Sequence, residues 1–278
     1  MVYLLLAILS SAMIAIMMRI AQPRVNYPTG LLAGNYIACS LLGLLLSVPE
    51  LSRLSVPSLV FPASLGILNG IFYLASFALM QWNTRYNGVT LSSVFMKLGI
   101  LVPTVLSVVW FREAPTALQI LGFLLAIAAI VIINFQKGQT VSRKSWALLL
   151  MLLIGGMGDG MSKVYEVYGD SGFQNLFLLF TFFAALMLCL GLMTKKQERL
   201  GLKELLFGFM LGIPNFLSSL FLLKSLDTVP AVIAFPTFSV AVILVVAVAG
   251  IFVFRETLQK RQILGGVLIC VALALLNL

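Results

Sequence analysis

The composition of this chain is that of a membrane protein. Its 278 residues are 61% hydrophobic and 10% charged, whereas a soluble domain carries roughly 25% charged residues. The formal net charge is +9, but the cations are distributed over short connections between apolar runs, which excludes a nucleic-acid partner as well as a soluble fold.

Apolar runs long enough to cross a bilayer follow one another along almost the whole chain. A transmembrane helix needs about 20 apolar residues, and runs that are apolar on all sides favour helices over the alternating strands of a β-barrel. The predicted spans are approximately 2–21, 29–47, 59–82, 88–110, 116–134, 146–168, 172–193, 203–225, 229–252 and 261–277. We therefore predict an all-α integral membrane protein with ten transmembrane helices.

The connections between spans differ in positive charge. One set of alternate connections contains 13 Lys and Arg residues and the other contains four at most. The positive-inside rule then places the first set in the cytoplasm and both termini outside. We expect a multi-pass protein of the cell membrane, the cytoplasmic membrane of a bacterium, with the lipid bilayer as its partner.

The residue types that usually support catalysis or metal binding are scarce. The chain has no histidine, and its three cysteines lie inside predicted spans without paired spacing. Disulfides and zinc sites are therefore unsupported, and motifs for a nucleophile elbow or a phosphate-binding loop are absent from the sequence. We expect no enzymatic activity, no cofactor and no metal.

One segment of the sequence occurs twice. FREAPTALQILG at 111–122 recurs as FRETLQKRQILG at 254–265. At an offset of 143 residues, 111–134 and 254–277 are identical at ten of 24 positions, which include Arg, Glu, Gln and Asn. Apolar composition alone does not produce matches of this kind.

Two further echoes extend the duplication. LGILN, which ends at Asn69, recurs as LGIPN, which ends at Asn215, at an offset of 146. Arg19 near the end of the first span falls opposite Lys163 in the sixth span, at an offset of 144. The chain is therefore predicted to consist of two homologous halves.

These halves are 1–136 and 137–278, with five predicted spans each. An odd number of spans inverts the second half, and inverted repeats enclose the substrate site of many secondary transporters near the bilayer midplane. Ten spans with an acidic turn before a helix that opens Gln-x-x-Gly in each half resemble the drug/metabolite transporter superfamily, EamA type. The resemblance covers essentially the whole chain.

This resemblance implies a carrier for small metabolites such as amino acids, sugars, nucleotide derivatives or drugs, with a central cavity between the halves. It also implies cytoplasmic termini, whereas the charge distribution predicts the opposite orientation. The glutamate that small four-helix relatives use in their first span has no counterpart here, so their proton exchange is not carried over. Import and export both stay open.

The repeated motif itself is interpreted as scaffold. Arg112 and Glu113 lie where the fourth span ends, at a depth where an adjacent pair can be hydrated. Gln119 and Gly122 are three residues apart, one helical turn, and the missing side chain of glycine lets a neighbouring helix approach closely. We expect the same of the second copy of the motif.

Lys97 is the first candidate for substrate binding. It lies about nine residues into the fourth span, roughly 13 Å along a helix axis, with no acid within helical reach. An ionisable group at this depth is costly and by default marks a pathway or a site. Two alternatives are open: direct contact with an anionic group of the substrate, or an ion pair with another helix, for example with Asp159.

The second candidate cluster is GGMGDGMSKVYE in the sixth span. Asp159 and Lys163 are four residues apart, and Lys163 and Glu166 three apart, so the three side chains can share one helix face. They either neutralise one another within the bilayer, or Asp159 and Lys163 contact substrate. In the second case Asp159 or Glu166 could take up a proton and couple transport to it.

Further pointers come from prolines, amides and aromatic residues. Pro103, Pro214 and Pro236 interrupt predicted spans and free backbone carbonyls that a protein-lined cavity can satisfy. Asn69 and Asn215 occupy matched mid-span positions and can bind either substrate or a neighbouring helix. Tyr73 and Phe95 can stack on a substrate, with core packing or lipid contact as the alternative.

The function expected from the sequence is secondary active transport. The protein would move a small polar metabolite, such as an amino acid or organic anion, across the cytoplasmic membrane by alternating access, as a monomer or homodimer. The alternatives are an exporter of drugs or aromatic compounds with the same fold and a non-transporting structural membrane protein.

Overall fold

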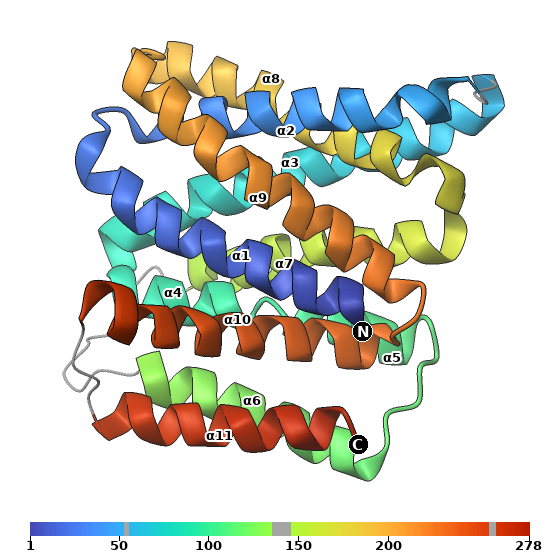
Figure 1. Ribbon diagram of the computed structural model, residues 1–278, viewed down its shortest axis with the longest axis vertical. Coiled ribbons are helices and arrows are strands. Elements are labelled where there is room, and N and C mark those ends of the chain that lie inside the picture. The colour runs from blue at the N-terminus through green and yellow to red at the C-terminus, as the bar shows by residue number, and fades with distance from the viewer. Residues whose placement is uncertain (53–55, 135–145, 256–259) are drawn as a thin grey trace. The chain divides into compact units, whose positions relative to one another are not determined.

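The computed structural model describes residues 1–52, 56–134, 146–255 and 260–278. The polar connection at 135–145 and Glu256 of the second acidic turn lie outside the described residues. The described chain is helical throughout and contains no strand (Figure 1). Its α-helices are α1 (Val2–Ala21), α2 (Pro28–Leu51), α3 (Val56–Asn87), α4 (Val89–Leu98), α5 (Leu101–Val109), α6 (Ala117–Asn134), α7 (Trp146–Tyr168), α8 (Gln174–Lys196), α9 (Leu202–Leu226), α10 (Ala231–Phe254) and α11 (Lys260–Leu276).

Most of these helices suit a membrane. Eight described segments are long and apolar enough to cross one, and Ala117–Ile133 of α6 is apolar but shorter. The fourth predicted span, 88–110, is not one helix but two, α4 and α5. The expectation of an all-helical membrane protein is confirmed, while the number of spans that cross the bilayer stays a prediction.

Two compact units share the described chain. The first contains Met1–Leu74 and Val164–Asp227, and the second contains Ala75–Lys163 and Thr228–Leu278. Each unit therefore draws on both of the predicted sequence halves. The halves are a prediction about duplication of the sequence, whereas the units follow from which helices pack together.

In the first unit, α2 and α8 pack against each other in opposite directions. The start of each helix is capped by an acid from the C-terminal end of the other helix. Glu50 at the end of α2 accepts hydrogen bonds from the backbone N–H groups of Asn175 and Leu176 at the start of α8, at 3.0 and 2.9 Å. Glu198, beyond the end of α8, accepts one from Thr29 in the first turn of α2 at 2.9 Å. Both helix starts thus have acceptors for N–H groups that no helix can satisfy internally.

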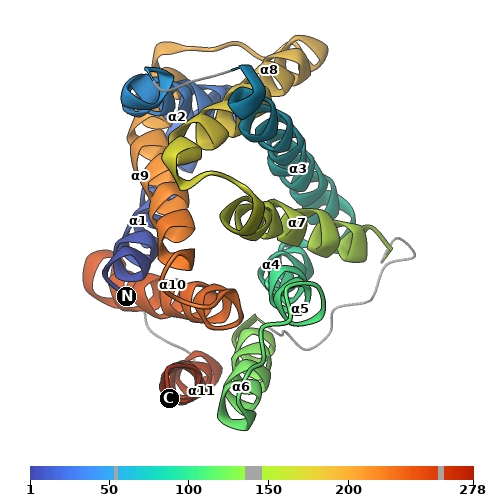
Figure 2. The same cartoon turned by 90° about the vertical axis from the view of Figure 1, so that its right-hand side faces the viewer.

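In the second unit, α6 and α11 lie side by side and run antiparallel (Figure 1, Figure 2). A Cβ atom at Gly122 would lie 3.1 Å from the carbonyl oxygen of Ala272, and one at Gly265 would lie 3.4 Å from that of Ala129. The close approach expected of both glycines is therefore confirmed. A core that includes Ile130, Val240 and Ile269 joins α10 to this pair.

Proline accounts for the break between α4 and α5. Pro103 has no N–H group, and its ring clashes with the carbonyl four residues earlier, which belongs to Gly99. Short-range bonds replace the α-helical pattern there, since the N–H of Ile100 donates to Lys97 at 3.5 Å and that of Val102 to Gly99 at 3.0 Å. The expected interruption is confirmed for this span, whereas α9 and α10 continue through Pro214 and Pro236.

Candidate substrate site

Lys97 lies one residue before the end of α4, at the break in the fourth span. Its side chain is half-buried, and in the described part of the second unit it forms no hydrogen bond or ion pair. The alternative in which Lys97 pairs with Asp159 is therefore not what the structure has. A cation in this position is left to interact with water or a ligand.

Helix α7 crosses the break closely. A Cβ atom at Gly156 would overlap the carbonyl oxygen of Gly99 and would meet Val102. The glycines of the sixth predicted span thus allow contact between two backbones, and α7 itself remains helical from Trp146 to Tyr168. The crossing fixes Asp159, one turn further along α7, in the same part of the second unit as Lys97.

Asp159 is the one acid without a polar partner in the described ranges. Its side chain is half-buried and makes no hydrogen bond or ion pair there. The other described acids each have a hydrogen bond, an ion pair or another electrostatic interaction: Glu50, Glu113, Glu166, Asp170, Glu198, Glu204 and Asp227. Most of these carboxylates cap the start of a helix, whereas Asp159 has no such structural contact.

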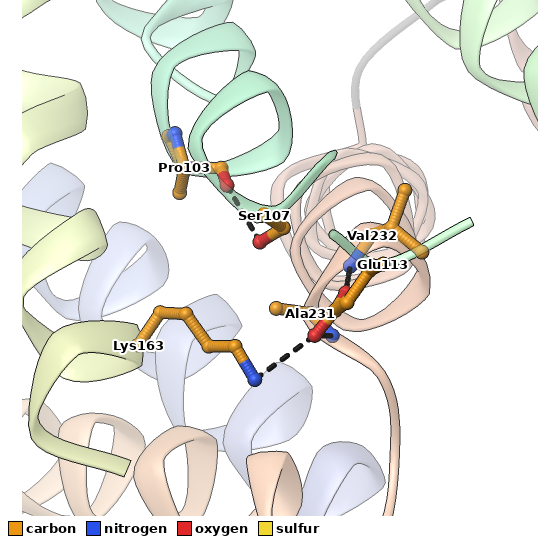
Figure 3. Close-up of polar contacts among 6 residues, drawn as sticks. All are labelled: Pro103, Ser107, Glu113, Lys163, Ala231 and Val232. Atoms are coloured by element: carbon orange, nitrogen blue, oxygen red, sulfur yellow. Dashed lines mark hydrogen bonds and ion pairs between the residues drawn. The ribbon is translucent and has the colours of Figure 1, made fainter. Parts of the chain in front are cut away.

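Lys163 pairs with an acid that the sequence had assigned to a different role. Its Nζ lies 2.9 Å from Oε1 of Glu113, and the side chain of Lys163 is buried (Figure 3). The two carboxylate oxygens of Glu113 also accept hydrogen bonds from the N–H groups of Ala231 and Val232, at 3.2 and 2.7 Å. Glu113 therefore neutralises Lys163 and caps α10 at the same time.

This contact corrects the expected link between Asp159 and Lys163 along α7. Asp159 forms no ion pair with the described residues, whereas Lys163 forms one with Glu113 in the turn after α5. Glu166 is half-buried and engaged in an interaction, and its contact with Lys163 stays a prediction. Glu113, which belongs to the motif interpreted as scaffold, is engaged by Lys163 and by the start of α10, a contact that sequence spacing alone does not reveal.

The remainder of the motif is structural, in keeping with its interpretation as scaffold. Thr116 and Gln119 form a capping box at the start of α6: the N–H of Thr116 donates to the Gln119 amide oxygen at 2.9 Å, and the N–H of Gln119 donates to the Thr116 hydroxyl at 3.2 Å. In α5, which precedes the motif, Ser107 donates to the carbonyl of Pro103 at 2.8 Å (Figure 3).

The two predicted asparagines lie in the first unit, each against a polar residue of a neighbouring helix. Asn69 donates to the hydroxyl of Thr181 at 3.5 Å, and Asn215 donates to the side-chain oxygen of Asn35 at 3.2 Å. Asn69 is 1% exposed, and its own Oδ1 has no hydrogen-bond partner in the described part of the chain. One buried acceptor is therefore available at this position.

Aromatic rings gather beside these amides in the first unit. The ring of Tyr73 meets Phe182 edge to face at 5.7 Å, and Phe182 also lies near Tyr36 and Phe216, at 6.4 and 5.9 Å. The Tyr73 hydroxyl lies 3.4 Å from that of Ser219. Phe95, by contrast, is half-buried on α4 in the second unit.

The predicted site residues therefore fall into two groups. Asn69, Tyr73, Asn215 and Glu166 belong to the first unit, whereas Lys97, Phe95, Asp159 and Lys163 belong to the second. Sequence reasoning missed Asn35 and Thr181. Their signal was present, because the offset of 146 that relates Asn69 to Asn215 also relates Asn35 to Thr181.

Comparisons with known proteins place the chain in a family. The model of the EamA-like transporter family matches twice, over residues 1–135 and 143–278. A Haemophilus influenzae protein described as uncharacterized is 22% identical over 271 residues, covering 94% of this chain and 92% of that protein. A solved crystal structure has the same fold, with a TM-score of 0.76 at 14% identity over 99% of this chain and 98% of that one. Since the two family matches together span nearly all of the sequence, the chain belongs to the EamA-like transporter family of multi-pass membrane proteins.

Proposed function

We propose that this protein is a secondary active transporter for a small polar metabolite with an anionic group, such as an amino acid or an organic anion. Two inverted halves, 1–136 and 137–278, with five membrane spans each, open in turn to the two sides of the cytoplasmic membrane. The substrate binds between them near the bilayer midplane. Lys97 supplies positive charge for a carboxylate or phosphate, and Asp159 binds a cationic group or a proton.

One observation supports this function above the others: two charged side chains in apolar helices have no partner in the described residues of their unit. Such groups cost several kcal/mol unless they are hydrated or paired. They are also absent from the other repeat, because the equivalent positions hold Val240 for Lys97, at an offset of 143, and Ala15 for Asp159, at an offset of 144. A residue that the scaffold needed would be expected in both halves.

Contacts between equivalent positions support the inverted duplication. Tyr73 and Ser219 are 146 residues apart, and so are Tyr36 and Phe182, yet each pair is in contact. Equivalent residues meet each other only beside a twofold axis that relates the repeats. The antiparallel pairs α2 with α8 and α6 with α11 join equivalent helices in the same way, and the family model matches each half once.

An exporter of drugs or aromatic compounds is the second candidate. The ring cluster of Tyr36, Tyr73, Phe182 and Phe216 favours it, because stacked and edge-to-face rings are the usual surface for planar apolar ligands. The partnerless charges are less easily explained by a neutral aromatic substrate. A non-transporting structural protein explains neither the charges of Lys97 and Asp159 nor the absence of each from the other half of the sequence.

Counterflow in proteoliposomes tests the proposal. A thermal-shift screen of purified protein against amino acids, organic anions, sugar phosphates and aromatic drugs first identifies a ligand, because a ligand that binds the folded state raises the melting temperature. Lys97→Ala should then abolish saturable counterflow of that ligand. Lys195→Ala, which removes an exposed cation at the end of α8, serves as the matched control and should transport normally.

Asp159→Asn separates binding from coupling. If Asp159 carries a proton, this variant should retain counterflow but lose its response to an imposed pH difference. A Lys97→Ala protein that is folded and transports the ligand at the wild-type rate would assign Lys97 a structural role and remove the main support for an anionic substrate.

A further inference from the structure

An apolar groove lies between α5, α6 and α10 in the second unit. Its volume is about 240 Å³, and its walls include Val105, Val108 and Val109 of α5, Phe123 of α6 and Val232 of α10. At 1.5 Å per residue, the lining extends about 7.5 Å along α5, from Thr104 to Val109, and about 6 Å along α6, from Gln119 to Phe123. The groove thus follows more than one turn of each helix.

The polar side chains of this groove are already engaged. The Thr104 hydroxyl donates to the carbonyl of Ile100 at 2.9 Å, and the Gln119 amide oxygen accepts from Thr116. A polar metabolite would find few free hydrogen-bond partners here. The lining therefore suits a hydrocarbon, which gains dispersion contacts that an empty apolar groove forfeits.

A second apolar groove lies on the other side of α5. It has a volume of about 390 Å³ and lies between α5 and α7, and Val105 and Val109 line this groove as well as the first. Its other walls include Trp110 and Leu152. The short helix α5 therefore has unfilled apolar space on both sides, and in a membrane the material that occupies such space is lipid.

The turn between two lining segments of the first groove contains a cation. Arg112 belongs to the turn that joins the groove residues Val109 and Pro115, and it is exposed. Its neighbour Glu113 does not neutralise it, because Glu113 is engaged by Lys163 and by the start of α10. Among the described residues Arg112 has no hydrogen bond or ion pair.

The backbone of Arg112 has a conformation that arginine adopts less readily than glycine. Its φ is 56°, in the left-handed region that favours glycine or asparagine at the end of a helix, and Arg255 in the second copy of the motif has a φ of 53°. Both copies of the motif thus place an arginine in this conformation at the end of a helix. A cation at this point complements the negative end of the preceding helix and can also bind a phosphate.

We propose that the groove between α5, α6 and α10 holds an acyl chain of an anionic phospholipid, whose phosphate is bound by Arg112. A turn between two apolar helices is expected at the depth of the lipid head groups, and the groove is lined by α5 and α6 on either side of this turn. Arginine binds phosphate with two parallel hydrogen bonds. Basic residues beside membrane helices attract anionic lipids in this way. The inference concerns a lipid site and does not depend on the identity of the transported substrate.

Native mass spectrometry of the full chain tests this assignment. The detergent-solubilised protein is titrated with phosphatidylglycerol and with phosphatidylcholine of identical acyl chains. Wild-type protein should retain the first phosphatidylglycerol about fivefold better, the size of effect that one basic residue has near anionic lipid. Arg112→Gln should abolish this preference, and Arg112→Lys should keep most of it. Lys195→Gln, at the end of α8, should change nothing.

The tail is tested separately from the head group. Val108→Phe fills the first groove and should reduce retention of both lipids, whereas Val248→Phe, at an exposed position of α10 outside the residues lining either groove, should not. All variants are compared at equal helix content and melting temperature. Wild-type lipid selectivity in Arg112→Gln would overturn the phosphate assignment. Unchanged lipid retention in Val108→Phe together with a changed oligomeric mass would assign the groove to a second copy of the chain and overturn the lipid site.

Discussion

The ion pair between Glu113 and Lys163 predicts strongly non-additive effects of mutation. Lys163 is buried and lies 2.9 Å from Glu113, whose side chain is 15% exposed. Removing one member of a buried pair leaves an uncompensated charge and costs about 3–5 kcal/mol. Glu113→Gln should therefore destabilise the protein by about this amount, although its amide oxygen can still accept one N–H group of α10. Lys163→Met should cost a similar amount, because Glu113 then lies largely buried without its cation.

The double variant should lose much less than the sum of the two single losses. An apolar or uncharged replacement of both members of a buried pair is often close to neutral, so a coupling free energy of about 2 kcal/mol or more is expected. The free energies of unfolding are measured by SDS-induced unfolding in mixed micelles, followed by circular dichroism. Single losses that simply add, or a Glu113→Gln variant as stable as wild type, would refute the conclusion that this contact is a buried, mutually dependent pair.

Three further perturbations follow from the packing and can be measured in the same unfolding assay. Gly156→Ala places a Cβ against the carbonyl of Gly99 and should lower the free energy of unfolding by about 1–3 kcal/mol. Gly191→Ala in α8, where a Cβ meets nothing within 4 Å, should be neutral or mildly stabilising. Equal effects of the two substitutions would contradict the close crossing of α7. Thr116→Ala removes the capping box of α6 and should cost about 1 kcal/mol, with Thr116→Ser close to wild type. Glu50→Ala and Glu198→Ala remove caps at opposite ends of the α2 and α8 pair and should add to within about 0.5 kcal/mol; a large coupling between them would show that the two ends are not independent.

The helical class of the protein could be read from the sequence because the bilayer imposes a strict condition. Every backbone polar group in hydrocarbon must find a partner within the protein, so long apolar runs can only become helices. The interruption of the fourth span was also predictable, since Pro103 cannot support a regular turn around Gly99. Pro214 and Pro236 have the same local chemistry, yet α9 and α10 continue through them. Local chemistry thus indicates where a helix can break, and packing against neighbours decides whether it does.

Residue spacing along one helix was a poorer guide to which charged side chains form ion pairs. Asp159, Lys163 and Glu166 can share a face of α7, which made a chain of charges plausible. Asp159, however, has no partner among the described residues, and Lys163 pairs with Glu113, 50 residues away in the chain. No local rule predicts this contact, because it requires the turn after α5 and the start of α10 to lie beside α7.

Apolar runs and a duplicated motif were thus sufficient for the sequence alone to determine the membrane class and the family resemblance, since both depend on local chemistry. Only the tertiary structure decided which charges have partners. In this structure Lys163 forms an ion pair with Glu113, whereas Lys97 and Asp159 have no partner in the described part of their unit. The physical reason is that neutralising a charge depends on distances of a few ångströms in space, and packing between helices sets those distances.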